Sequence, residues 1–164
     1  MWNSQTYGKL KLKEIPEKLL DFYNRNLVYG EEIAIAIGTD SQTHDCGTKI
    51  VTVISIICKG HGGIFFHTTE YRDPITIVKQ KLETETYISL ETAKLLLDEL
   101  ETDKYRVLLK NCPFSIHIDA GNAPNGKTKD LIQGLTGWVH AMGYKCQVKP
   151  DAYSASSVAD RLSK

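Results

Sequence analysis

Three aspartates stand where a carboxylate could take part in chemistry. Asp40 ends the apolar run IAIAIGTD, and Asp119 ends the run FSIHID just before a glycine-rich turn. Asp160 lies in the C-terminal stretch SSVADRLSK, whose small residues suit close packing. Taken singly, the first two are typical turn residues and the third is typical of a solvated helix. Taken together, carboxylates at the ends of strands that can be neighbours indicate a site.

A fourth carboxylate, Glu85, lies on the apolar stripe of a long predicted helix. The stripe recurs at spacings of three and four residues. Its members are Val78, Leu82, Glu85, Ser89, Ala93, Leu96 and Leu100. A carboxylate among buried aliphatic side chains is costly unless it is paired, protonated or bound to a metal. Glu85 therefore either binds a metal ion, or pairs with a lysine, or extends its carboxylate to the edge of the stripe.

Oxygen ligands of this kind are the ones that Mg²⁺ and Mn²⁺ prefer. Two such ions can clamp the attacking and leaving oxygens of an in-line phosphodiester displacement. Without metal ions the carboxylates would repel one another and their pKa values would rise. We therefore predict that Asp40, Glu85, Asp119 and Asp160 hold two Mg²⁺ or Mn²⁺ ions when substrate is bound.

The segment GNAPNGKT, residues 121–128, suggests a different chemistry. It fits the phosphate-cradling P-loop pattern through Gly121, Gly126, Lys127 and Thr128. However, the strand-like runs before it read as hairpins, whereas a P-loop protein has a parallel sheet. Too little chain follows Thr128 to supply several further strands. A P-loop phosphohydrolase is therefore the less favoured alternative.

Hydrophobic periodicity places these residues on a succession of strands and helices. We predict a helix in 15–27, antiparallel strands in 32–42, 48–60 and 62–71, and a long helix in 74–100. A strand in 114–119, a helix in 127–142, a strand in 144–150 and a helix in 153–164 follow. This order predicts an α/β fold with a mixed five-stranded sheet flanked by helices. We expect a single domain over 1–164, with 1–30 as an N-terminal helical extension.

Composition narrows the class of protein. The 20 basic and 20 acidic residues balance, so the molecule as a whole does not attract polyanions, although a local patch can. The four cysteines, Cys46, Cys58, Cys112 and Cys146, are widely separated, which argues against a zinc site or a disulfide framework. The longest apolar run is too short to span a bilayer, and the N-terminal stretch lacks the apolar centre of a signal peptide. We expect a cytoplasmic protein without a membrane partner.

The order of elements and the four carboxylates together resemble the ribonuclease H fold. More closely, the blocks IGTDSQ, HIDAG, NGKTKDLI and KPDAYSASSVAD resemble the YkuK-type family of bacterial ribonuclease-H-like proteins. The resemblance covers most of residues 33–164 and implies the fold more firmly than the activity. It implies that Asp40, Glu85, Asp119 and Asp160 are the metal ligands of a nuclease. It also implies that Asp151 stands about where some members have a mobile catalytic histidine.

Several further residues are candidates for a role at such a site. His117 is predicted to face the same side as Asp119, where it either orients a carboxylate or packs as a structural histidine. Substrate phosphate is expected to meet Asn125, Lys127, Thr128 and Lys149, in a C-terminal region with a mild excess of positive charge. We therefore expect a metal-dependent nuclease or phosphodiesterase acting on RNA or DNA. The alternative is a non-catalytic nucleic-acid or protein-binding module that keeps this fold.

Overall fold

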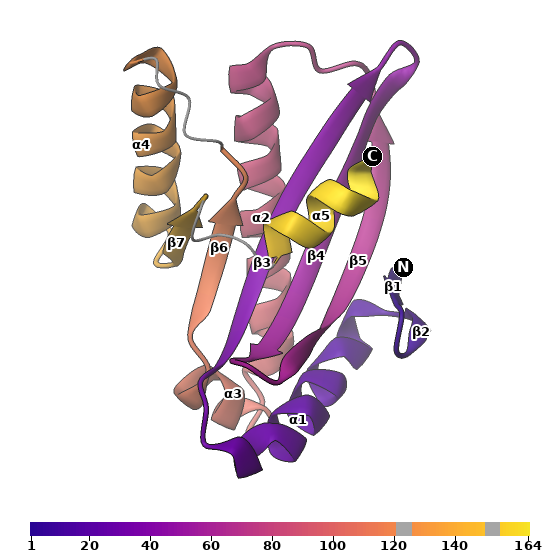
Figure 1. Cartoon of the computed structure of the whole chain (residues 1–164), viewed down its shortest axis with the longest axis vertical. Coiled ribbons are helices and arrows are strands. Elements are labelled where there is room, and N and C mark those ends of the chain that lie inside the picture. Colours follow the sequence, from indigo (N-terminus) through magenta and orange to yellow (C-terminus); the bar gives the residue numbers. More distant parts are fainter. Residues whose placement is uncertain (121–125, 150–154) are drawn as a thin grey trace.

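The computed structural model describes residues 1–120, 126–149 and 155–164, with the side chains of 1–120, 129–149 and 158–164. Its centre is a seven-stranded sheet in the order β2-β1-β5-β4-β3-β6-β7 (Figure 1). The strands are β1 (Trp2–Ser4), β2 (Gly8–Leu10), β3 (Ile33–His44), β4 (Gly47–Cys58), β5 (Gly62–Arg72), β6 (Phe114–Ile118) and β7 (Lys145–Val148).

The sheet is mixed because two kinds of connection build it. Strands β3, β4 and β5 follow one another through short turns and pair antiparallel over almost their whole length. Strands β6 and β7 instead pair parallel, β6 to β3 and β7 to β6. A helix precedes each of them, as a parallel crossover requires. This confirms the predicted α/β fold with a mixed sheet.

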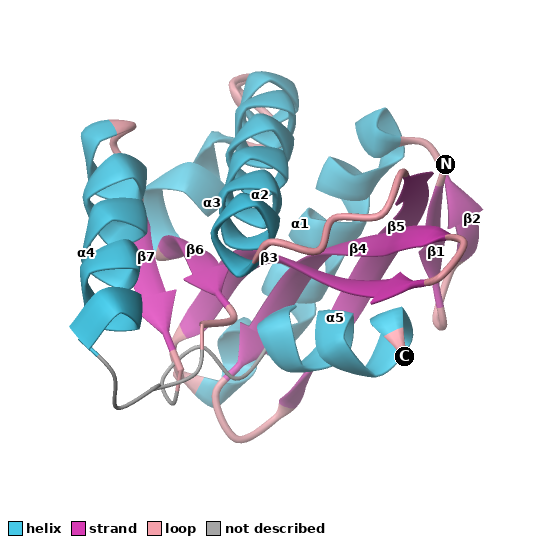
Figure 2. Cartoon of the chain, turned by 90° about the horizontal axis from the view of Figure 1, so that it is seen from above, coloured by secondary structure: helices cyan, strands magenta, loops and turns pink. Residues whose placement is uncertain are grey.

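Helices cover both faces of the sheet, but unequally (Figure 2). Helices α1 (Ile15–Asn26), α2 (Val78–Leu100), α3 (Arg106–Asn111) and α4 (Gly126–Ala141) lie on one face, and α5 (Ala155–Ser163) lies on the other. Two 3₁₀ turns, Leu12–Glu14 and Leu27–Tyr29, flank α1. Within the described parts of the chain, every helix is too short or too polar to cross a lipid bilayer.

The strand count differs from the prediction, which was five. The two additional strands, β1 and β2, are three residues each, too short to show an alternating pattern. They form because the edge of β5 offers β1 a partner, with Asn3 opposite His67. Helix α3 was also not predicted, since six residues are too few to establish a helical period. Helix α2 begins at Val78, four residues after Pro74, near which we expected it to start.

Two cores hold the layers together. The larger lies between the sheet and the helices of the α2 side, and includes Ile35, Ile37, Leu96 and Ile116, each at most 1% exposed. The smaller lies under α5 and consists of Ala36, Val51, Val53 and Ala159, with three partly buried neighbours. Because alanines face each other here, the backbone of α5 can approach β3 closely.

The far end of α5 is fixed by a second contact. Lys49 Nζ, on β4, donates a hydrogen bond to the carbonyl oxygen of Leu162 at 2.5 Å. A cation at this position satisfies one of the unpaired carbonyl groups at the helix C-terminus and complements the helix dipole. In Figure 1, α5 accordingly lies across β3, β4 and β5, and leaves the lower part of the same sheet face uncovered by a helix.

Candidate metal centre

Asp40 and Asp119 are brought together by strand pairing. Strands β3 and β6 are parallel neighbours in which Thr39 lies opposite Ile118. Asp40 and Asp119 are the next residues along, and adjacent strands lie about 4.8 Å apart. Side chains alternate along a strand, so both carboxylates point to the face that carries α5. The register of a single strand pair therefore accounts for this part of the site.

Asp160 joins the two from helix α5. One carboxylate oxygen each from Asp40, Asp119 and Asp160 can be chosen so that all three lie within 4.8 Å of one another. We call this group the acidic triad. Ser163, one turn after Asp160, donates a hydrogen bond from Oγ to Asp40 Oδ2 at 2.6 Å. Ser163 is 1% exposed, so this hydrogen bond fixes the last turn of α5 against β3.

Asp40 is a buried carboxylate of the triad. It is 9% exposed, and this burial raises the pKa of its carboxyl group above the usual 3.8. The charges of Asp119 and Asp160 raise the pKa further, whereas the hydrogen bond from Ser163 lowers it. Like charges in a poorly solvated place account for this direction of shift. A cation at the triad would relieve both costs.

Two lysines supply positive charge to the triad. Lys149 Nζ, just beyond β7, lies 2.5 Å from Asp119 Oδ1, and Lys164 Nζ lies 2.9 Å from Asp160 Oδ2. The hydrogen bond to Asp119 raises the pKa of Lys149, and the charges of Asp160 and Asp40 raise it further. The Asp119 side chain is 7% exposed in this pair and Lys149 is 40% exposed. Lys149 thus neutralises part of the triad from its solvent side.

Glu85 lies beside the triad, but it does not belong to the group of residues whose carboxylate oxygens lie within 4.8 Å of one another. Its Oε1 accepts a hydrogen bond from Ser41 Oγ at 2.6 Å and lies 3.9 Å from Lys81 Nζ. Glu85 is 4% exposed, and burial raises its pKa to about 8, with a further contribution from the charge of Asp40. The expected core position is therefore observed, and its neighbours are polar rather than aliphatic.

A buried polar seam between β3 and α2 explains how Glu85 is tolerated. One turn after Glu85, Ser89 Oγ lies 2.8 Å from Thr39 Oγ1, which also donates to Thr52 Oγ1 at 3.2 Å. Thr39 and Ser41 alternate with Asp40 and so point to the opposite face, towards α2. The polar residues of the α2 stripe, Glu85 and Ser89, thus contact hydroxyl groups of β3.

The donor set fits a hard divalent cation. All three triad side chains offer carboxylate oxygens, the ligands of Mg²⁺ and Mn²⁺. Mg²⁺ binds oxygen at 2.0–2.1 Å, so ligands on opposite sides of one ion are about 4.2 Å apart. Ligands on adjacent sides are about 2.9 Å apart, so oxygens that lie within 4.8 Å of one another would be drawn closer together around a single bound ion.

Some predicted residues lie outside the described part of the structure. Asn125 and Asp151 are not described, and for Lys127 and Thr128 only the backbone is, within α4. The P-loop pattern over 121–128 is therefore largely outside it as well. The strands β3, β4 and β5 that precede the pattern are antiparallel, unlike the sheet of a P-loop nucleotide hydrolase.

His117 is 5% exposed and points to the same face as Asp119. Its Nε2 lies 3.1 Å from Ser115 Oγ, and it also hydrogen bonds to the side chain of Gln147. Burial lowers its pKa to about 4, and the hydrogen bond to Gln147 opposes that shift. His117 is therefore neutral at pH 7, and it belongs to a polar row that crosses from β6 to β7.

Ser163 and Ser41 were not singled out from the sequence, although each contacts a predicted ligand. A signal exists for Ser163, since it follows Asp160 by three residues and so lies on the same side of the helix. Ser41 is next to Asp40, but its contact with Glu85 joins residues far apart in the chain. Only the packing of α2 on β3 reveals that contact.

Three antiparallel strands, then helices and parallel strands, with an acidic triad contributed by β3, by the residue after β6 and by α5, define a ribonuclease H-like protein. The family model described as "Ribonuclease H-like" matches residues 14–164, and the chain belongs to this family. It is similar to the "Uncharacterized protein YkuK" of Bacillus subtilis (strain 168), with 33% identity over 166 residues. That match covers 96% of this chain and 93% of the relative. The resemblance to the YkuK-type family is thereby confirmed.

Proposed function

We propose that this protein is a divalent-metal-dependent phosphodiesterase that cleaves a nucleic-acid backbone. The observation that supports this most directly is the acidic triad, three carboxylates from three separate elements with oxygens within 4.8 Å of one another. Such convergence costs electrostatic free energy in the absence of a cation. A binding protein for polyanions gains nothing from it, whereas a metal-dependent hydrolase needs it.

Asp40, Asp119 and Asp160 would hold Mg²⁺ or Mn²⁺, and Glu85 is the proposed fourth ligand. When bound, the metal ions supply an activated water and stabilise charge on the phosphoryl oxygens. Ser163 keeps one oxygen of Asp40 in a fixed direction through its 2.6 Å hydrogen bond. Burial raises the pKa of Glu85 to about 8, which favours its protonated form near neutral pH in the metal-free protein.

The nearby cations are proposed to bind the substrate. Lys149 would exchange its contact with Asp119 for a phosphate oxygen once a metal ion balances the triad. Lys127, with Asn125 and Thr128, is proposed to meet phosphate at the N-terminus of α4, where free backbone N–H groups favour anions. Asp151 remains a candidate for an auxiliary role at the same site.

The test measures metal binding and cleavage on the same samples. Titration calorimetry with Mn²⁺ compares the wild type, an Asp40→Asn/Asp119→Asn variant, and a control Asp45→Asn/Asp103→Asn variant with the same change of charge. Both control positions are exposed. We expect the wild type and the control to bind Mn²⁺ and to cleave labelled RNA, DNA or hybrid, and the triad variant to do neither. A triad variant that cleaves as well as the wild type would refute the proposal.

A non-catalytic nucleic-acid-binding module is the second candidate, and one observation favours it. Lys149 and Lys164 already pair with two carboxylates of the triad, so part of its charge is balanced without a metal ion. In that case oligonucleotide binding would not depend on Mn²⁺, and no cleavage would be seen with any of the three substrates.

A further inference from the structure

A cleft of about 390 Å³ lies on the α5 face of the sheet, in a part that α5 does not cover. This volume is within the range of ordinary ligand sites. Its floor comes from β3 and β6, and its sides from β4 and β7. The lining residues used below are Ala34, Ala36, Ser115, His117, Lys145 and Gln147. We call this the sheet cleft.

The sheet cleft and the acidic triad share one surface. Ser115, His117 and Asp119 follow one another at intervals of two residues, and Ala36 precedes Asp40 by four. Alternate residues of a strand face the same way, so these side chains lie on one face of the sheet. From Ser115 to Asp119 the strand advances about 13 Å. A polymer whose phosphate lies at the triad can therefore extend along the strands into the cleft.

Small side chains keep the floor of the cleft open. Ala34 and Ala36 are the lining residues from β3, where larger apolar residues would fill the space. Ala36 belongs to both regions, since together with Val53 it also packs against Ala159 of α5. The cleft thus begins where the cover of α5 ends, next to the triad.

The charges at the two sides of the cleft suit a polyanion. Lys59 follows the end of β4 and Lys145 begins β7, so they flank the strands β3 and β6 between them. Both lysines are exposed, and Glu32 is the acidic residue that the described lining contains. Lys149, two residues after Gln147, continues the positive charge towards the triad.

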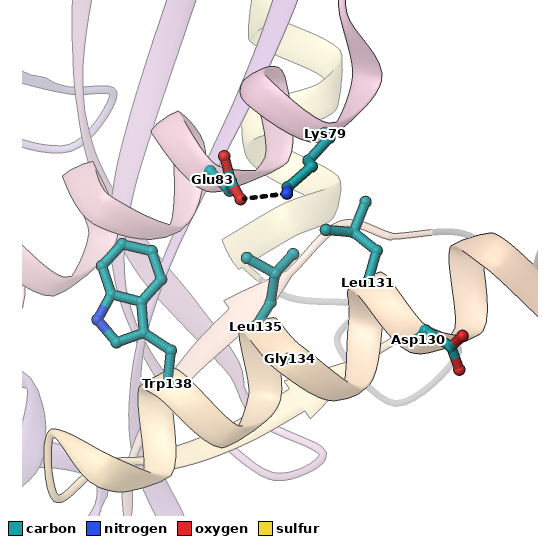
Figure 3. Close-up of a pocket in the computed structure, with 7 residues that line it drawn as sticks. All are labelled: Lys79, Glu83, Asp130, Leu131, Gly134, Leu135 and Trp138. Atoms are coloured by element: carbon teal, nitrogen blue, oxygen red, sulfur yellow. Dashed lines mark ion pairs between the residues drawn. The ribbon is translucent and has the colours of Figure 1, made fainter.

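A larger cavity elsewhere lacks this character. A groove of about 750 Å³ between α2 and α4 is lined by apolar Leu131, Leu135 and Trp138, as Figure 3 shows. Its charged lining residues are two acids and one base, with Lys79 paired to Glu83 at 3.8 Å. The local charge of that groove is therefore unfavourable for phosphates.

The floor and the β7 side of the sheet cleft also offer side chains that form hydrogen bonds. Ser115, His117 and Gln147 form a hydrogen-bonded row across β6 and β7. An imidazole, an amide and a hydroxyl group each take part in hydrogen bonds. Such groups suit base edges and sugar hydroxyls, which recognition of a single strand leaves accessible.

We propose that the sheet cleft binds a segment of single-stranded nucleic acid continuous with the segment at the acidic triad. Lys59 and Lys145 contact its phosphates, and the row of Ser115, His117 and Gln147 contacts its bases or sugars. This inference rests on the proposed function, because it takes the triad as the place of the scissile phosphate. It extends that function by naming a single strand, and not a duplex, as the bound form.

Fluorescence anisotropy tests the proposal with labelled oligo-dT and oligo-U of about 12 nucleotides, a length within the range of single-strand binding sites. Ca²⁺, a hard cation that carboxylates also bind, replaces Mn²⁺ in the titrations. In an Ala34→Phe variant the phenyl ring fills the cleft floor and would clash with a bound strand, so we expect binding at least about tenfold weaker. A Lys59→Ala/Lys145→Ala variant is expected to bind more weakly, with the slope of log K against log salt reduced by about 1.4.

A Lys13→Ala/Lys94→Ala variant is the matched control, since it removes the same charge from exposed positions outside the cleft lining. Wild-type affinity and salt slope in both cleft variants would overturn the proposal, as would a wild-type protein that binds a duplex and no single strand. Mn²⁺ calorimetry on the wild type and the cleft variants distinguishes a failure of the cleft proposal from a failure of the proposed function. Intact metal binding with unchanged oligonucleotide binding refutes the cleft alone, whereas no Mn²⁺ binding by the wild type refutes the proposed function. Since both lysines are exposed, their double variant keeps the test valid if Ala34→Phe fails to fold.

Discussion

Lys149 Nζ lies 2.5 Å from Asp119 Oδ1, and the charges of Asp160 and Asp40 also act on this ammonium group. The lysine therefore balances the same carboxylates that a divalent cation would balance. Any cation that binds the acidic triad must compete with Lys149 or displace it. This competition makes the lysine a measurable influence on metal affinity.

We expect a Lys149→Met variant to bind Mn²⁺ more tightly than the wild type. Removing one positive charge from a partly exposed site lowers the repulsion of the incoming ion by about 1–2 kcal/mol, or roughly tenfold in affinity. Methionine retains most of the length of the side chain and no charge. Calorimetry with Mn²⁺ alone, in the absence of nucleic acid, measures the change. A Lys145→Met variant, altered at the exposed first residue of β7, should bind like the wild type. Tighter binding in both variants would mean that the loss of any nearby positive charge raises the affinity, and not the loss of Lys149 in particular.

Metal removal should lower the stability of the folded protein. A ligand that binds only the native state adds about 2.7 kcal/mol at a concentration of 100 times its Kd. We expect the thermal midpoint to rise with Mn²⁺ and to return to its original value with a chelator. In an Asp40→Asn variant this rise should be largely lost, while the midpoint in chelator should equal or exceed that of the wild type, because a poorly solvated charge that Asp119 and Asp160 repel is gone. An undiminished rise in that variant would show that Mn²⁺ binds elsewhere.

Glu85 should make the metal-free protein less stable as the pH rises. Its pKa is about 8 in the folded protein and 4.5 ordinarily, so the native state holds a proton that the unfolded chain releases. The stability that this group contributes is complete below about pH 4.5 and is lost as the pH rises through about 8. We expect a loss on the order of 2–5 kcal/mol over that interval, measured by urea unfolding in chelator.

A Glu85→Gln variant should lose most of this pH dependence, since glutamine can still accept the hydrogen bond from Ser41 and cannot ionise. The exposed Glu83→Gln variant, on the same helix, serves as the control and should follow the wild-type curve. Equal pH dependence in the Glu85→Gln variant would show that other groups cause it.

Removal of the Ser163 hydroxyl should weaken both the fold and the metal site. Ser163→Ala deletes the 2.6 Å hydrogen bond to Asp40 and leaves a poorly solvated carboxylate oxygen with one donor fewer, at a cost of about 1–3 kcal/mol. Because the same bond holds the last turn of α5, Mn²⁺ affinity should also fall several-fold. Ser55→Ala is the matched control: Ser55 is 1% exposed and donates to the carbonyl of Ala36 at 3.2 Å. It should lower stability without changing Mn²⁺ affinity.

Much of the fold could be predicted because the relevant patterns are local. The alternation in Ile33–His44 specifies a strand, and the spacing from Leu82 to Leu100 specifies the buried side of a helix, with Glu85 on it. The three-residue strands β1 and β2 and the six-residue helix α3 carry too little pattern to be predicted. They depend on partners that the rest of the fold supplies.

The candidate site divides in the same way. The sequence by itself determined that Asp40 and Asp119 follow apolar strand-forming runs and that Glu85 lies on a buried stripe, since neighbouring residues reveal those positions. It did not determine where the first of these strands ends, because β3 continues four residues beyond Asp40 to His44. Only the tertiary structure decided that Asp40, Asp119 and Asp160 meet within 4.8 Å, that Ser163 bonds to Asp40, and that Lys149 pairs with Asp119. Those contacts depend on strand register and on the close approach of α5 over alanines. They join residues as far apart as 123 positions, and no local periodicity encodes such a pairing.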